Sequence, residues 1–252
     1  MNLAIDIGNS RAKVGFFAED GTLTEVWNYS HVEFLADFAH AKGLEKLSER
    51  VKYIGVASVG KEDMKQALVS LADTLPQAAL FEIDYRTPLP IRNGYASPKT
   101  LGIDRLCSAV GAYTQTGQLP LLVIDAGTAI TYDYVDVEGV YQGGGISPGI
   151  RTRYRALHDY TAALPYLEKV EDPALIGDTT ANSIHSGVVN GVLEEIRGIV
   201  ARYNELPGPD LSVFLTGGDA EFLGNHLKNL NFVDPNLLLS GIHSIILFNA
   251  HA

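Results

Sequence analysis

The chain has 252 residues, of which 46% are hydrophobic and 19% are charged, and its formal net charge is −11. This length accommodates two domains of ordinary size, and the apolar content is high enough for a packed core, which excludes a disordered chain. The acidic surface would repel nucleic acid and anionic membranes, so we expect neither as a partner.

The single cysteine, Cys107, allows no intrachain disulfide, which fits a reducing compartment. The N-terminus lacks the basic region and the long apolar region of a signal peptide. Near the other end, the apolar stretch 237–248 is interrupted by polar residues and is shorter than the roughly 20 residues that span a bilayer. We therefore expect a cytoplasmic protein.

In the first half, apolar runs alternate with turns. The pattern predicts strands over 3–7, 12–17 and 22–27, followed by a helix over 32–47 and a strand over 53–57. A helix over 62–72, a strand over 79–83, a proline-containing loop over 86–98 and a helix over about 103–113 complete this half.

The second half begins in the same way. Strands are predicted over 121–125 and 128–135, with a third from residue 140, and helices over 152–163 and 182–203. A strand over 211–215, a short helix after residue 218 and a last helix around 236–248 follow.

The two halves share one plan: strand, Asp-x-Gly turn, strand, acidic-Gly turn, strand, then helices and further strands. Asp6 precedes Gly21 by 15 positions, and Asp125 precedes Gly139 by 14. We interpret this as a diverged duplication of one α/β unit, with domains 1–117 and 118–252 and a boundary near residues 115–120. A central cleft between the two domains would bring the two Asp-x-Gly turns face to face.

The first turn, Asp6-Ile7-Gly8-Asn9-Ser10, ends an apolar strand. Gly8 allows close approach of the backbone to a ligand, and the N–H groups that follow can face a phosphate. Lys13 could compensate charge, whereas Asp6 would repel a phosphate unless a cation or a metal-bound water lies between them. Taken alone, the segment could equally be a plain hairpin turn.

The second turn, Asp125-Ala126-Gly127-Thr128-Ala129, repeats this chemistry at the equivalent place, which favours phosphate binding over coincidence. A further glycine turn, at Thr216-Gly217-Gly218-Asp219-Ala220, leads from a strand into a helix. The free N–H groups at such a helix start can bind a phosphate-bearing group.

Gly102-Ile103-Asp104-Arg105 stands where the proline-containing loop meets a helix. Phosphorylation of an alcohol requires a base that removes the hydroxyl proton, and Asp104 is our candidate. Arg105 could bind a phosphate or a carboxylate. The alternative is an Asp at a helix start that pairs locally with Arg.

Two glycine-rich segments are judged to be decoys. Residues 55–61 nearly spell a P-loop, but Glu62 stands where a Ser or Thr should bind Mg²⁺. Gly143-Gly144-Gly145 lacks the spacing of a dinucleotide-binding motif, so we interpret it as a turn or a close packing site.

In order along nearly the whole chain, these motifs resemble those of type III pantothenate kinases. The likeness rests on Asp-Ile-Gly-Asn-Ser-Arg-Ala-Lys at 6–13, Gly-Ile-Asp-Arg at 102–105, Asp-Ala-Gly-Thr-Ala at 125–129 and Thr-Gly-Gly at 216–218. It extends to Gly94-Tyr95, to the stretch 149–165, and to Gly177-Asp178-Thr179-Thr180 with Ser186-Gly187.

The resemblance implies two ribonuclease-H-like domains of the acetate and sugar kinase, Hsp70 and actin superfamily. It implies transfer of phosphate from ATP to pantothenate, the first step of coenzyme A synthesis, by a homodimer with its pantothenate pocket near the subunit interface. It assigns ATP contacts to Asp6, Ile7, Gly8, Asn9, Ser10, Arg11, Ala12, Lys13 and Thr128.

By the same resemblance, Asp104 is the base. Asp125 helps to hold a monovalent cation, K⁺ or NH₄⁺, and we assign to Asp6 a contact with Mg²⁺ through water. The substrate pocket is assigned to Tyr95, Gly102, Ile103, Asp104, Arg105 and Thr180, with Thr180 acting across the interface.

This sequence departs from the family at Ser10, where Thr is more usual, at Ile103, where the residue is commonly smaller, and around Asp178-Thr179-Thr180. None of these changes removes a required chemical group. Two alternatives remain open: a kinase for another small hydroxylated or carboxylate substrate, such as a sugar or acetate, and a regulatory protein of reduced activity. An actin-like or chaperone ATPase would need inserted subdomains for which 252 residues leave no room.

Overall fold

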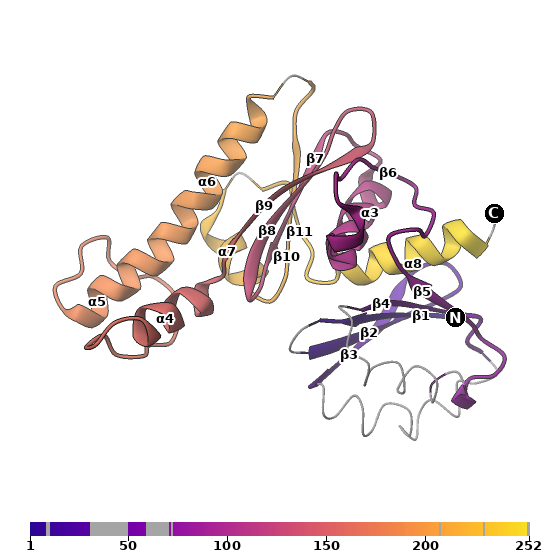
Figure 1. The fold of residues 1–252 in the computed structure, drawn as a ribbon, viewed down its shortest axis with the longest axis horizontal. Helices are drawn as coiled ribbons and strands as arrows, with labels where there is room; N and C mark the ends of the chain where they lie inside the picture. Colours follow the sequence, from indigo (N-terminus) through magenta and orange to yellow (C-terminus); the bar gives the residue numbers. More distant parts are fainter. Residues whose placement is uncertain are drawn as a thin grey trace. The chain divides into compact units, whose positions relative to one another are not determined.

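The computed structural model describes residues 1–8, 11–30, 50–58, 71, 73–206, 208–228 and 230–250. The chain forms two compact units, Met1–Gly117 with Leu237–Ala252, and Gln118–Asn236 (Figure 1). The helix predicted over 32–47 and most of the one predicted over 62–72 lie outside the described residues. No helix within these ranges is long and apolar enough to cross a membrane.

The first unit contains a five-stranded sheet with the strand order β3-β2-β1-β4-β5. Its strands are β1 (Asn2–Ile7), β2 (Arg11–Phe17), β3 (Leu23–Ser30), β4 (Tyr53–Ser58) and β5 (Ala79–Ile83). β1 is antiparallel to β2 and parallel to β4; β2–β3 pair antiparallel and β4–β5 parallel. The short strand β6 (Arg92–Asn93), a 3-10 turn η3 (Pro98–Thr100) and helix α3 (Ile103–Thr116) follow.

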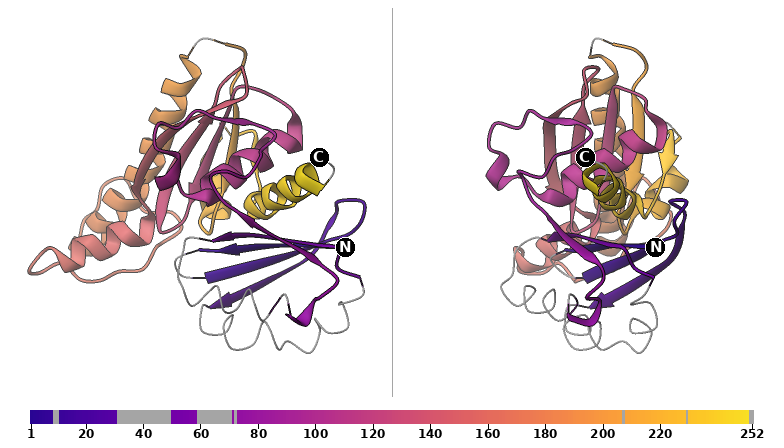
Figure 2. Two further views of the ribbon diagram at one scale, coloured as in Figure 1. Left: turned by 45° about the vertical axis from the view of Figure 1, so that its right-hand side comes forward. Right: turned by 90° about the vertical axis from the view of Figure 1, so that its right-hand side faces the viewer.

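The central strand β1 is a nearly continuous apolar run because both faces of the sheet are covered. Leu3, Ile5 and Ile7 pack into one apolar cluster on one side. Helix α8 (Leu237–Ala250) also packs on this sheet, where it contacts β1, β2 and β4. It runs beside α3, as the two views of Figure 2 show. The contact between α3 and α8 is very close at Gly111 and Gly241, where a side chain would meet the other helix's backbone.

The second unit repeats this arrangement. Strands β7 (Leu121–Ala126), β8 (Ala129–Val135), β9 (Val140–Pro148), β10 (Ser212–Thr216) and β11 (Phe232–Val233) lie in the order β11-β10-β7-β8-β9. β7–β8 and β8–β9 are antiparallel, whereas β7–β10 and β10–β11 are parallel. When the order is given from β9 to β11, as β9-β8-β7-β10-β11, it corresponds strand by strand to β3-β2-β1-β4-β5 of the first unit, with the same directions. The predicted duplication of a ribonuclease-H-like unit is therefore confirmed.

The helices of the second unit are α4 (Ile150–Asp159), α5 (Thr180–His185), α6 (Gly191–Asn204) and α7 (Ala220–His226), with a π-helical turn η4 (Ser186–Asn190) between α5 and α6. Together, α5, η4 and α6 form the helix that the apolar periodicity predicted over 182–203. All four helices contribute apolar side chains to one core with β7, β8 and β10. Between α4 and α5, residues 160–179 form neither helix nor strand.

Two features differ from the prediction. Strands β6 and β11 have two residues each, which is too short for a periodic pattern, and they were not predicted. Residues 237–252 were assigned to the second domain, whereas α8 is part of the first unit because its apolar face packs on α3 and β1. The division into domains 1–117 and 118–252 otherwise stays a prediction.

Candidate functional site

The first Asp-x-Gly turn joins β1 to β2. The N–H of Gly8 donates to the carbonyl of Arg11 at 3.0 Å, which closes the turn. Asp6 lies one residue before the end of β1, half-buried and opposite Lys13 of β2. Ile7 and Ala12 are buried and pair across the hairpin, and Arg11 is exposed. The predicted contacts of Asn9 and Ser10 lie outside the described residues.

Asp104 lies in the first turn of α3, and its Oδ1 accepts the N–H of Arg105 at 2.9 Å. A side chain at Gly102 would fall 2.3 Å from that oxygen, so this glycine lets the carboxylate lie close to the backbone that precedes α3. Arg105 is buried, with 8% of its surface exposed, and so is Ile103.

A buried thiol connects the two motifs of the first unit. Burial raises the pKa of Cys107, and the negative charges of Asp6 and Asp104 raise it further. Both carboxylates are therefore close enough to this one thiol to interact with it electrostatically. Asp6 and Asp104 belong to separate motifs and are 98 positions apart in the sequence, yet the fold brings both of them to the same part of the first unit. Cys107 itself is a buried free cysteine.

Tyr95 belongs to the loop between β6 and η3. Its N–H donates to the side-chain oxygen of Asn93 at 3.0 Å, and its side chain is half-buried.

The glycine at position 55, which begins the segment that resembles a P-loop, has a packing role in the same unit. Gly55 lies within β4, where a side chain would collide with Ile246 of α8, so it serves packing.

The second Asp-x-Gly turn is shorter than the first. The N–H of Gly127 donates to the carbonyl of Ala129 at 2.9 Å. The carbonyl of Thr128 accepts two bonds from the start of α4, from the N–H of Gly149 at 3.0 Å and from the hydroxyl of Thr152 at 2.7 Å. The Thr128 side chain is exposed. This turn is thus fixed through its backbone, and its side-chain hydroxyl faces solvent.

The glycine turn after β10 lies directly against the second Asp-x-Gly turn. Gly217 has φ of +95°, and a side chain there would fall 2.4 Å from Oδ1 of Asp125 and 2.5 Å from the carbonyl of Ala126. Carboxylate and carbonyl oxygens are the ligands that hard cations prefer. The residues present therefore fit the predicted monovalent cation.

Asp219, at the end of this glycine turn, begins helix α7. Its N–H donates to the carbonyl of Ala126 at 2.9 Å, and its carboxylate accepts from Nζ of Lys169 at 2.8 Å. The ammonium group also lies 4.2 Å from the ring centroid of Phe222. Lys169 was not predicted as a site residue, since no local pattern marks a partner 50 positions away.

Thr180 is the first residue of α5. The hydroxyl of the preceding Thr179 accepts the N–H of Asn182 at 3.1 Å and caps the helix, whereas Thr180 lines an open apolar pocket of about 750 Å³. Both threonines are exposed, and the assignment of Thr180 to the substrate pocket stays a prediction. The pocket lies between α4 and α5–η4 and is lined by Arg153, Ala156, Leu157, Tyr160, Thr161, Leu164, Thr180, Ser183, Ile184, Gly187 and Val188.

A polar cluster joins α4, α6, β8 and β9. Glu195 accepts from Arg153 and Ser147, each at 2.5 Å, and from the hydroxyl of Tyr132 at 2.9 Å. Burial would raise the pKa of Glu195, but these hydrogen bonds outweigh it and hold the pKa below its ordinary value. Arg153 also donates to the carbonyl of Pro148 at 2.8 Å, so the cluster stabilises the start of α4.

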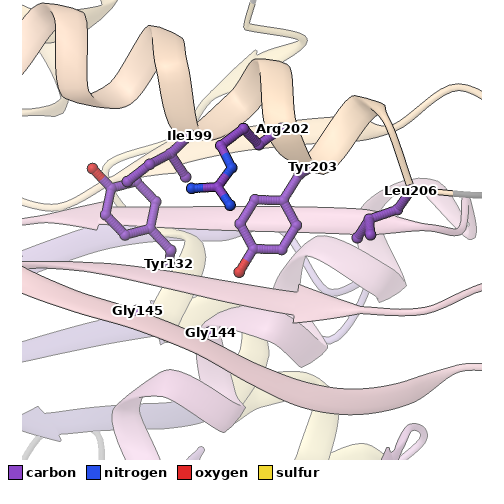
Figure 3. A pocket seen from close by; sticks show the side chains of 7 residues that line it. All are labelled: Tyr132, Gly144, Gly145, Ile199, Arg202, Tyr203 and Leu206. Atoms are coloured by element: carbon purple, nitrogen blue, oxygen red, sulfur yellow. The ribbon is translucent and has the colours of Figure 1, made fainter.

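Figure 3 shows a second hollow of about 350 Å³, between α6 and strands β8 and β9. The guanidinium of Arg202 lies between the rings of Tyr132 and Tyr203. A side chain at Gly144 would fall 1.9 Å from the carbonyl of Tyr132, so this glycine permits close packing, as predicted for the Gly143–145 run. None of the predicted site residues lines this hollow.

Comparison with solved structures defines the class of fold. A Baf family protein of Campylobacter jejuni matches with a TM-score of 0.64 at 22% identity, over 99% of this chain and 100% of that one. A ROK family glucokinase of Streptomyces griseus matches with a TM-score of 0.50 at 13% identity, over 98% and 99%. The protein shares with these two structures a fold of duplicated ribonuclease-H-like units.

Sequence comparison is more specific. A sequence model of the type III pantothenate kinase family matches residues 2–202. Type III pantothenate kinases of Flavobacterium psychrophilum and Flavobacterium johnsoniae are 41% and 42% identical over 245 residues each. The alignments cover 97% and 96% of this chain, and 98% and 96% of the two relatives. The chain belongs to the type III pantothenate kinase family.

Proposed function

We propose that this protein phosphorylates pantothenate with ATP and forms 4′-phosphopantothenate and ADP, the first step of coenzyme A biosynthesis, in the cytoplasm. The observation that carries the proposal is the membership of nearly the whole chain in one family of kinases. The duplicated fold supports it, because that fold also occurs in a glucokinase.

The first Asp-x-Gly turn is assigned to the nucleotide. Backbone N–H groups from residues 6–13 and the ammonium of Lys13 would bind phosphate oxygens, and Thr128 is also assigned a contact with the nucleotide. Mg²⁺ would neutralise charge on the phosphates, and Asp6 would contact it through water. The half-buried position of Asp6, opposite Lys13, suits such a mixed-charge environment.

Asp104 is assigned as the general base. Its carboxylate would accept the proton of the pantothenate hydroxyl as that oxygen attacks the γ-phosphorus, and ADP would leave with the electrons of the broken bond. Tyr95, Gly102, Ile103 and Arg105 would bind the acceptor. The buried guanidinium of Arg105 is suited to the pantothenate carboxylate.

Asp125 is assigned to a monovalent cation, K⁺ or NH₄⁺. Such a cation would allow a carboxylate to lie near the nucleotide phosphates without repulsion. Gly217 lies against both the carboxylate of Asp125 and the carbonyl of Ala126, which supports this assignment, since both groups offer oxygen ligands.

The functional form is assigned as a homodimer through the face formed by α4, α5 and the segment between them. Tyr160, Leu175 and Ile176 are 89%, 80% and 84% exposed on this face. Tyr160 also lines the apolar pocket that contains Thr180. A second copy would cover these side chains and place Thr180 near its partner's substrate, and sedimentation of the pure protein tests this arrangement.

The experiment that tests the function measures ADP release with ATP, Mg²⁺ and K⁺, with and without pantothenate. We expect release that depends on pantothenate, falls when Na⁺ replaces K⁺, and is absent with glucose or acetate as acceptor. Release that ignores pantothenate but responds to a sugar would favour another kinase of this fold. Absence of release with every acceptor would favour the regulatory alternative.

A further inference from the structure

Lys169 makes the ion pair described above from the irregular segment 160–179, and it belongs to none of the motifs of the candidate site. The pair is shielded: 29% of the Lys169 side chain and 21% of the Asp219 side chain are exposed. The ring of Phe222, itself 6% exposed, covers the ammonium. An ion pair with this degree of shielding can hold a specific geometry, whereas fully exposed pairs contribute little.

Asp219 occupies the N-cap position of α7, and Asp at this position usually accepts an N–H of its own helix. Here its side chain makes no such capping bond and instead accepts from Lys169. The usual local role of the residue has thus been replaced by a long-range one. This exchange indicates that the position of Asp219 relative to the segment 160–179 matters.

The backbone of Asp219 connects the pair to the second Asp-x-Gly turn. Its N–H donates to the carbonyl of Ala126, and Gly217, two residues earlier, lies against both that carbonyl and the carboxylate of Asp125. Movement of Asp219 would therefore shift the two groups that surround Asp125. All of these residues belong to the second unit.

We propose that Lys169 is a positioning residue: by holding Asp219, it fixes the Gly217–Asp219 turn against Asp125 and so sets the geometry of the cation and nucleotide contacts of this turn. The proposal rests on the proposed function, since it assumes that Asp125 serves a cation beside ATP. Lys169 acts through Asp219 and makes no contact with the phosphates in this assignment.

The test compares Lys169→Met, which keeps the length of the side chain without its charge, with Lys169→Arg, which keeps the charge. Lys228→Met is the matched control, because Lys228 is an exposed lysine just after α7 and belongs to none of the assigned sites. ADP affinity is measured by calorimetry at several K⁺ concentrations, together with the melting temperature. KM for ATP, KM for pantothenate and kcat are measured by ADP release.

For Lys169→Met we expect the Kd of ADP, the KM of ATP and the half-saturating K⁺ concentration each to rise about 5- to 10-fold, because small displacements of a site cost affinity. The KM of pantothenate should stay within about 2-fold, since the residues assigned to the acceptor are held by other contacts. Lys169→Arg should restore most of the loss, and Lys228→Met should behave as wild type.

The proposal is overturned if Lys169→Met binds ADP and responds to K⁺ as wild type does. It is also overturned if both KM values rise together with a fall in melting temperature, because that pattern indicates a merely structural role. If the wild-type protein binds ADP in a K⁺-dependent way but does not phosphorylate pantothenate, the proposed substrate is refuted. The role of Lys169 is then decided by comparing the Kd of ADP, and its dependence on K⁺, between wild type and Lys169→Met. A wild-type protein without ADP binding would refute both.

Discussion

The close crossing of α3 and α8 makes a quantitative prediction for Gly241→Ala. A Cβ at position 241 would fall 1.8 Å from the carbonyl oxygen of Cys107 and 3.0 Å from the N–H nitrogen of Gly111. Non-bonded carbon and oxygen atoms approach to about 3.3 Å, so the helices would have to separate by about 1.5 Å. The obstructing atoms belong to backbone and cannot rotate away, as a side chain could.

Overpacking of this kind costs typically 1–3 kcal/mol, and contact with backbone places Gly241→Ala at about the upper end. Alanine recovers roughly 1 kcal/mol of helix propensity relative to glycine. We therefore expect a net loss of about 2 kcal/mol, which for a chain of this size lowers the melting temperature by about 4–8 °C. Turnover should fall as well, because α3 carries Asp104 and Arg105 in its first turn.

Gly198→Ala is the matched control, since Gly198 lies within α6 with nothing within 4 Å of its would-be Cβ. The same chemical change there should stabilise the protein by about 0.5–1 kcal/mol. Urea unfolding of the two variants beside wild type measures both effects. The two substitutions are chemically the same, and only the surroundings of the two glycines differ. If the free energy of unfolding changes by the same amount and in the same direction in both variants, the reasoning is refuted.

Two further predictions concern charge. Asp104→Asn should lower kcat of pantothenate phosphorylation by about 10² or more if Asp104 is the base, with the KM of ATP nearly unchanged; near-normal turnover would remove Asp104 from that role. The pKa of His243 is lowered to about 4, mainly by burial and to a smaller extent by the positive charge of the N-terminal amine. The folded protein therefore keeps this side chain neutral down to low pH, whereas the unfolded chain takes up a proton on it below about pH 6.5. Its contribution to stability is therefore complete above pH 6.5 and is lost as the pH falls toward 4, and we expect about 2 kcal/mol less stability at pH 5 than at pH 7.5 from this group. His243→Gln should reduce that difference in urea unfolding, and an unchanged pH dependence would show that other groups cause it.

The parts of the fold that were predicted are those in which local pattern and burial agree. β1 and β7 are central strands with both faces covered, so their sequences are largely apolar, and each has its Asp one residue before the end of the strand. The helix pattern at 182–203 survives the π-helical turn because the apolar face continues through it. The equivalence of the two Asp-x-Gly turns was visible as a repeat of the same residue types at the same place.

The parts that were missed depend on contacts between distant segments. Nothing in the apolar sequence of α8 says on which unit it packs; the complementary glycines at 111 and 241 decide that. Lys169 and Asp219, or Arg153 and Glu195, lie 50 and 42 positions apart and belong to no motif. The chemical roles of Asp104, Asp125 and Thr180 stay predictions, since they require bound ligands to be tested.

The placement of α8 has a consequence for the order in which the protein can be made. All residues of the second unit, 118–236, leave the ribosome before α8 does, yet the first unit needs α8 to cover β1 and β4. Domains usually fold during synthesis with the N-terminal one first. Here we expect the reverse: the unit of residues 118–236 completes its core while one face of the N-terminal sheet is still uncovered, and α8, which is synthesised after that unit, closes the first unit.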